Sequence, residues 1–280
     1  MASIRNLVLS VSVLLSIANF SNCNTVVFDD GGYSCDPRPD DATSADFKTN
    51  LNSLLSALEE KAPDNHGFYA AAAGKNPDRL YGLVQCRGDV SAPDCATCVK
   101  DSVTWATRRC NNSNEAAVWL DRCYLRYSDG NFLGQGNGSR IALNPTNATD
   151  GPLVAAIGRN YMRVLAADAL NQPYLFEAGS VDVGVMGKRY GLVQCNRDLS
   201  MADCRICTAT LLEFYFVGNW NPSSYRLLSY GCRAWYDIYK FYSDYALPSD
   251  PGNVIKTGPD QTSVQFVNFI GLHYETVKTE

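Results

Sequence analysis

A block of sequence with fixed cysteine positions occurs twice in this chain and limits the folds open to it. The hexapeptide YGLVQC at residues 81–86 recurs at residues 190–195, which is 109 positions later. Three further cysteines keep that offset, because Cys95, Cys98 and Cys123 correspond to Cys204, Cys207 and Cys232. A unit of about 105 residues is too long for one solenoid repeat, so the pattern predicts two tandem domains. The length of 280 residues also fits two domains.

The repeat and the composition around its copies divide the chain into five segments. Residues 134–149 are rich in glycine and asparagine, as is typical of a linker. Residues 250–280 have no counterpart in the first copy, and their prolines and glycines favour an irregular tail. We expect a signal peptide at 1–23, a first cysteine-rich domain at 24–133, the linker at 134–149, a second cysteine-rich domain at 150–249 and the tail at 250–280.

The N-terminal 23 residues have the features of a secretory signal peptide. Arg5 supplies the positive charge, and the apolar run at residues 7–17 is too short to span a bilayer core of about 30 Å. Cleavage fits after Ala18 or after Cys23, and the second site is favoured because it leaves ten cysteines, an even number. The longest later apolar segment, residues 261–274, is short and interrupted by polar residues. We therefore expect a secreted, extracellular protein without a membrane span.

The missing cysteines of the second copy indicate one disulfide of the first. The second copy has no equivalent of Cys35 or of Cys110. Two cysteines that are lost together were bonded together, so we pair Cys35 with Cys110. The second domain then has one covalent tie fewer, and we expect it to unfold first on heating.

The other four cysteines of each domain allow three pairings, which local geometry narrows. Residues 91–94 (SAPD) predict a helix start, which places Cys95 and Cys98 on one face of the helix. Cys86 ends a strand-like run, and Cys123 lies in another. This geometry favours Cys86–Cys95 with Cys98–Cys123, and likewise Cys195–Cys204 with Cys207–Cys232 in the second domain.

Hydrophobic periodicity predicts an α+β domain with an antiparallel sheet and helices on one face. Ser44 can cap a first helix, whose apolar stripe is Phe47, Leu51, Leu54, Leu55 and Leu58. A second helix is expected at residues 92–108, and strands are expected at 67–73, 80–86 and 118–127. The aromatic residues within 235–245 predict a sheet face of the second domain and a candidate aromatic binding platform.

Composition excludes several classes of function. With 24 basic and 29 acidic side chains, the chain carries a net charge of −5, which argues against a nucleic-acid partner. The 2 histidines leave little room for histidine catalysis. The Cys-x2-Cys pairs resemble zinc or redox motifs, but the secretory context and the duplicated Cys86 and Cys123 favour structural disulfides. We expect no enzyme activity, no metal and no cofactor. Three sequons mark candidate glycosylation sites at Asn111, Asn137 and Asn147.

The spacing Cys86-x8-Cys95-x2-Cys98, repeated as Cys195-x8-Cys204-x2-Cys207 behind YGLVQ, resembles the plant cysteine-rich repeat secretory proteins. These proteins are built from ginkbilobin-like, stress/antifungal domains, and the resemblance covers residues 24–249. It implies two helices packed on a roughly five-stranded antiparallel sheet in each domain, with three disulfides in the family's domain. It also implies the apoplast as the place of action.

A single-domain relative in this family binds mannose and is antifungal, and its sugar contacts can be placed on this sequence. In the first domain these positions hold Asp36, Ala117 and Ser128, so two of the three contacts are lost. In the second domain the last two positions hold Arg226 and Asp237, which could donate and accept hydrogen bonds with vicinal hydroxyls. An ordinary surface ion pair is the alternative for these two residues.

The resemblance therefore leaves two functions open. One is a secreted binding protein in plant stress and defence, antifungal and carbohydrate-binding, with cell-wall or fungal glycans as partners. The other is a protein-interaction module that resembles a receptor-kinase ectodomain, binds a receptor or wall protein and binds no sugar. The loss of sugar-contact residues in the first domain favours the second.

Overall fold

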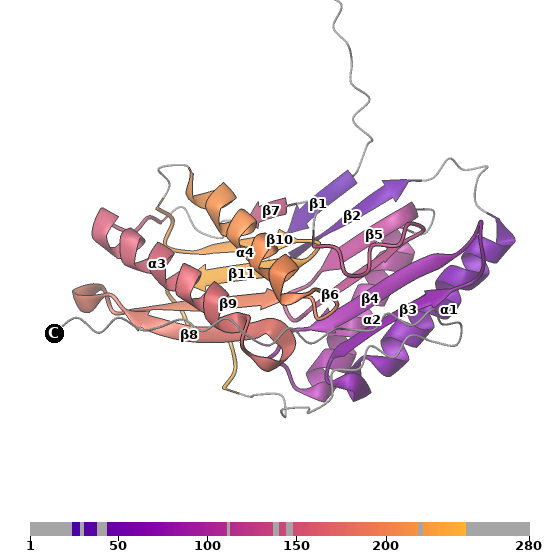
Figure 1. Ribbon diagram of the computed structural model, residues 1–280, viewed down its shortest axis with the longest axis horizontal. Helices are drawn as coiled ribbons and strands as arrows, with labels where there is room; N and C mark the ends of the chain where they lie inside the picture. The colour runs from indigo at the N-terminus through magenta and orange to yellow at the C-terminus, as the bar shows by residue number, and fades with distance from the viewer. Residues whose placement is uncertain are drawn as a thin grey trace, which may run out of the picture.

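The computed structural model describes residues 24–28, 31–37, 44–110, 113–136, 140–143, 148–217 and 221–244. Two units lie side by side, each an antiparallel sheet with two helices packed on it (Figure 1). The first unit runs from indigo to magenta and the second from salmon to yellow. The α+β class and the tandem arrangement predicted from the repeat are confirmed.

The first unit contains a six-stranded sheet in the order β1-β2-β5-β6-β4-β3. Its strands are β1 (Asn24–Phe28), β2 (Gly31–Pro37), β3 (Phe68–Ala73), β4 (Leu80–Cys86), β5 (Ser113–Trp119) and β6 (Cys123–Ser128). Its helices are α1 (Ala45–Lys61) and α2 (Ala92–Arg109). The single strand expected at 118–127 is instead a hairpin, because the chain turns at residues 120–122 and Leu120 N donates to Cys123 O at 2.9 Å.

The second unit contains a five-stranded sheet in the order β7-β10-β11-β9-β8. Its strands are β7 (Arg140–Leu143), β8 (Phe176–Asp182), β9 (Lys188–Cys195), β10 (Tyr225–Ser229) and β11 (Cys232–Asp237). Its helices are α3 (Pro152–Ala169) and α4 (Met201–Phe216). The strand β7 lies within residues 134–149, where the sequence predicts a linker, and it pairs antiparallel with β10. Within the described residues, β1 has no counterpart in this sheet.

Serine side chains begin three of the helices. Ser44 Oγ accepts a hydrogen bond from Phe47 N at 2.9 Å, as the predicted cap requires. Ser91 and Ser200 occupy equivalent positions in the two repeats, and each caps its helix by accepting from the amide three residues later. Each cap satisfies an amide that would otherwise lack a partner, an effect worth about 1 kcal/mol.

The apolar stripe predicted for the first helix is the part of α1 that packs on the sheet. All five of its residues are buried, and they form one core with Val84 of β4 and Leu125 of β6. A separate core fills the second unit, where Met162 and Leu165 of α3 and Leu211 of α4 pack on Val193 of β9. Each unit therefore has a hydrophobic core between its helices and one face of its sheet.

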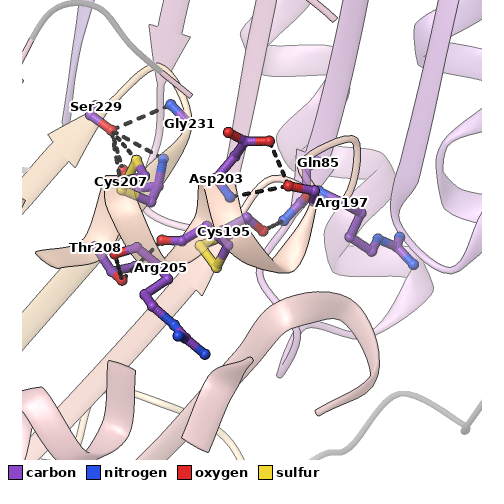
Figure 2. Close-up of a disulfide and its surroundings, with 12 residues drawn as sticks. Gln85, Cys195, Arg197, Asp203, Arg205, Cys207, Thr208, Ser229 and Gly231 are labelled. Atoms are coloured by element: carbon purple, nitrogen blue, oxygen red, sulfur yellow. Dashed lines mark hydrogen bonds between the residues drawn. A yellow bond between two sulfur atoms is a disulfide. The ribbon is translucent and has the colours of Figure 1, made fainter. Parts of the chain in front are cut away.

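Disulfides join α2 and α4 to the sheets with the partners expected from the repeat. The five bonds are Cys35–Cys110, Cys86–Cys95, Cys98–Cys123, Cys195–Cys204 and Cys207–Cys232. Around the last of them, Ser229 Oγ donates to Cys232 O at 3.0 Å and accepts from Gly231 N at 3.3 Å (Figure 2). The serine thereby fixes the turn between β10 and β11, which carry both residues proposed from the sequence as sugar ligands.

Candidate functional site at the junction of the two units

The two units meet through the sheet faces that their helices leave uncovered. Gln85 Nε2 donates to Cys195 O at 2.8 Å, and Gln194 Nε2 donates to Cys86 O at 3.3 Å. Gln85 Oε1 also accepts from Arg197 N at 2.8 Å. Because Gln85 and Gln194 are equivalent in the repeat, the contact is reciprocal, and each glutamine binds the backbone of the other unit.

An aromatic cluster spans the same junction. Trp119 of β5 is buried and stacks on Tyr124 of its own unit and on Tyr230 of the second, with ring centroids 5.6 and 5.5 Å apart. Its indole Nε1 donates to Ser229 O at 3.0 Å. Leu83 and Leu228 complete the cluster from the two sheets. This buried apolar contact joins the two units into one body.

Charged groups are also buried at the junction, among them Arg126 and Asp198. The guanidinium of Arg126 lies between the rings of Phe132 and Tyr230, with its carbon 4.1 and 4.0 Å from their centroids, and pairs with Glu115 at 2.8 Å. Asp198 Oδ2 of the second unit accepts from Gly134 N at 2.8 Å. Burial raises the pKa of the Asp198 carboxyl from 3.8 to about 6, although the hydrogen bond from Gly134 opposes that rise.

A small hollow opens beside this contact, between the turn after β5 and the helix-free face of the second sheet. Arg87, Leu120 and Asp121 line it from the first unit, and Leu192, Arg226, Leu228, Arg233, Ala234 and Trp235 line it from the second. Its volume of about 20 Å³ is close to that of one bound water, so the hollow cannot enclose a sugar ring.

The structure brings Arg226 and Asp237 to one face of the second sheet. Arg226 is opposite Trp235 in the register of β10 and β11, and Asp237 follows Trp235 by two residues. The guanidinium carbon of Arg226 lies 3.7 Å from the centroid of the Trp235 ring. Asp237 Oδ2 accepts from Trp235 Nε1 at 3.4 Å. Both candidate sugar ligands are therefore in contact with one tryptophan.

Other contacts within the protein use the same groups. Asp237 Oδ2 accepts from Ser224 Oγ at 2.9 Å, and Asp237 Oδ1 accepts from Ile238 N at 2.7 Å. The ring of Phe241 stacks on Trp235 with centroids 3.8 Å apart. Since Arg226 lies equally close, the two groups cover opposite faces of the indole. Trp235 thus has no free face for a ligand, and β11 ends at Asp237, before the remaining aromatic residues of 235–245.

Two of the three positions equivalent to the sugar contacts in the first unit are closed. Ala117 is fully buried, and Ser128 is buried at the end of β6. Asp36 lies on β2, opposite Glu115 of β5, where a second carboxylate rather than a sugar hydroxyl is its neighbour across the strands.

Sequence reasoning missed two arginines that line the hollow. Arg87 Nε and Nη2 donate to both oxygens of Asp89 at 2.8 Å, and Nη1 lies 3.4 Å from Asp121 Oδ1. Arg233 makes no hydrogen bond or ion pair with any residue that the structure describes. The signal for Arg233 was present in the repeat, because the equivalent residue of the first unit is the buried Tyr124.

The electrostatic setting of Arg233 is unfavourable for its charge. Burial, together with the nearby charge of Arg87, lowers the pKa of Arg233 to about 10, while Asp121 and Asp89 oppose that change. The side chain still carries its positive charge at neutral pH. The hollow therefore holds a cation without a counter-ion of its own among the described residues.

Several predictions lie outside the described residues. These are the signal peptide at 1–23, the tail at 250–280 and all three sequons, at Asn111, Asn137 and Asn147. In the described part of the chain, no three or more histidine, cysteine or acidic residues gather as a metal site would require. The helices of that part also lack the length and hydrophobicity needed to cross a bilayer.

Known proteins are similar to this chain in both sequence and fold. Residues 34–130 match the family described as salt stress response/antifungal. The chain is 30% identical to cysteine-rich repeat secretory protein 55 of Arabidopsis thaliana, over 94% of this chain and 98% of that protein. It is 31% identical to cysteine-rich receptor-like protein kinase 8 of the same plant, over 82% of this chain and 35% of the kinase.

A solved structure shares the tandem fold. It is the crystal structure of the tandem DUF26 ectodomain of the Arabidopsis thaliana cysteine-rich receptor-like protein PDLP8. The similarity has a TM-score of 0.62 at 24% identity and covers 73% of this chain and 96% of the ectodomain.

Proposed function

Because this chain belongs to the cysteine-rich repeat secretory proteins, we propose that it acts in the apoplast as a stress-related protein-interaction module. The relatives are secreted proteins or parts of receptor-like proteins, which supports an extracellular role and a protein partner. Five disulfides suit an oxidising compartment.

The observation that carries this proposal is the use of the candidate sugar ligands inside the protein. Asp237 already accepts hydrogen bonds from Ser224, Trp235 and Ile238. Arg226 and Phe241 lie against the two faces of Trp235. A sugar at this place would have to displace these contacts, and each displaced hydrogen bond to a charged group costs about 1.5–3 kcal/mol.

The contact between the units supports a protein partner in a second way. The buried cluster of Trp119, Tyr230 and their neighbours fixes the two repeats relative to each other. A partner can then contact both repeats without first ordering them, and the entropy cost of binding is correspondingly smaller.

A glycan array with a matched variant tests this proposal. The full chain and its Arg226→Ala variant are applied to mannose-terminated and cell-wall glycans, and both are used in affinity capture from extracellular extracts. We expect no concentration-dependent glycan signal and one reproducible protein partner. A saturable mannose signal that disappears in Arg226→Ala would overturn the proposal and favour a lectin with Arg226 and Asp237 in its site.

Antifungal action is a second candidate, favoured by the family match over residues 34–130. In this version the partners are glycans or proteins of the fungal wall. Purified protein is added to fungal hyphae, and protein with reduced and alkylated disulfides serves as the control. Growth inhibition by the native protein alone supports this role, and equal growth in both samples contradicts it.

A further inference from the structure

The charged side chains around the hollow do not all form ion pairs. Arg87 donates hydrogen bonds to both oxygens of Asp89 and also contacts Asp121. The two carboxylates near Arg233 are therefore already paired with Arg87. Arg233 therefore lies beside a paired arginine without a described partner of its own. A guanidinium that is partly withdrawn from water in this way is stabilised by any anion that can reach it.

The fold itself does not require a charge at this position. Tyr124 is the equivalent of Arg233 in the first unit, and it is buried in the aromatic cluster at the junction. In the second unit Arg233 is opposite Leu228 and Gln194 in the strand register, on the helix-free face that forms the hollow. An arginine in place of an aromatic residue adds a positive charge and several N–H donors, which suits an anionic ligand.

The walls of the hollow define the chemistry of that ligand. Leu192 and Leu228 are apolar walls, which strengthen an ionic hydrogen bond by excluding water. The volume of about 20 Å³ admits one small group rather than a chain of charges. Both faces of Trp235 are covered, so a sugar ring cannot stack there. A guanidinium in such a place suits a planar carboxylate, which can accept two parallel hydrogen bonds.

We propose that the hollow binds one side-chain carboxylate of a protein partner, with Arg233 as the direct ligand and Arg226 beside it. This inference rests on the proposed function and specifies the chemistry of its binding surface. A segment with an exposed aspartate or glutamate would place its carboxylate at the mouth of the hollow, against the half-buried Arg233. Asp121, at the outer side of the hollow, would disfavour a run of acidic residues and thereby select a single one.

The first test uses carboxylate alone. Thermal unfolding of the full chain is measured in sodium acetate and in sodium chloride at equal ionic strength and pH. We expect acetate to raise the melting temperature of the wild type and of Arg205→Gln, which removes an exposed arginine of α4. Arg233→Gln and Arg233→Tyr, the second of which restores the residue of the first unit, should not respond. An equal response in all four proteins, or an equal effect of chloride, overturns the proposal.

The second test identifies the source of the carboxylate. A fluorescent peptide with a single glutamate, its glutamine analogue and a short oligouronate are titrated against the full chain. We expect the glutamate peptide to bind best and to lose about tenfold or more in affinity with Arg233→Gln. Tighter binding of the oligouronate would overturn the assignment to a protein side chain.

The failure of this inference can be told apart from the failure of the proposed function. If acetate acts through Arg233 but no protein partner is captured, only the proposed function fails. If a captured partner binds Arg233→Gln as well as wild type, only this inference fails.

Discussion

Gln85 and Gln194 occupy the same place in the two repeats, and each donates its side-chain amide to the carbonyl of the cysteine that follows the other. The repeated sequence YGLVQC thus serves two purposes. Its apolar residues build a central strand in each unit, and its glutamine joins the units. The two contacts are not equal, because Gln85 also accepts from Arg197 N, while Gln194 Oε1 has no hydrogen-bond partner among the residues that the structure describes.

The glutamine contact predicts an unequal effect of two equivalent mutations. Gln85→Ala removes a donor and an acceptor from a buried site and leaves Cys195 O and Arg197 N without that partner. We expect it to lower the free energy of unfolding by about 2–3 kcal/mol, measured by chemical denaturation. Gln194→Ala should cost less, since it removes a single bond of 3.3 Å. The exposed Gln172→Ala is the control, and a larger cost for Gln194→Ala would contradict the account.

Asp198 predicts a dependence of stability on pH. Its pKa is raised to about 6 in the folded protein from an ordinary 3.8, so the folded state holds the proton more tightly than the unfolded chain. The free energy of unfolding should therefore fall as pH rises from about 4 to about 6, by about 2 kcal/mol from this group. Denaturation across this range checks the slope.

Asp198→Asn tests the origin of that slope. Asparagine keeps an acceptor for Gly134 N but does not titrate, so the variant should lose most of the fall between pH 4 and 6. The exposed Asp64→Asn should keep the wild-type slope. If both variants behave alike, Asp198 is not the group responsible.

The disulfides predict which unit opens first. Cys35–Cys110 closes a sequence separation of 75 residues in the first unit, and the second unit has no equivalent bond. By the chain-entropy account such a loop adds about 4 kcal/mol. Hydrogen exchange on the full chain should therefore show faster exchange in α3 and β9 than in α1 and β4.

Removal of the Cys35–Cys110 disulfide provides the matched comparison. In the Cys35→Ala, Cys110→Ala double variant, α1 and β4 should approach the exchange rates of their counterparts in the second unit. Slower exchange in the second unit of the wild type would contradict the disulfide account. Unchanged rates in the double variant would assign the difference to packing instead.

Much of the fold could be predicted from the sequence because its signals are local. Ser44 and Ser91 mark helix starts, and the pattern of cysteine loss identifies Cys35 and Cys110 as partners. The strand β7 was not predicted, because its four residues lie in a segment whose glycine and asparagine content is typical of a loop. Only pairing with β10 makes it a strand, and that pairing is not a local property.

The site was harder to predict for a related reason. The sequence pattern proposes Arg226 and Asp237 together as sugar ligands. Their contacts with Trp235 could not be predicted, because they depend on strand register and on the stacking of Phe241 on the ring. Arg233 was not predicted, because the prediction used only the residues that the two repeats share. The mismatch of Arg233 with Tyr124 was visible in the sequence, yet its meaning depends on the junction between the units.

The most direct test of the account is hydrogen exchange of the full chain with and without its captured protein partner. Our account predicts that the partner protects the rim of the hollow, in residues 120–121 and in β10 and β11, and that Arg233→Gln removes this protection. Protection confined to another surface, such as the outer side of α4, with the hollow unchanged, would contradict it.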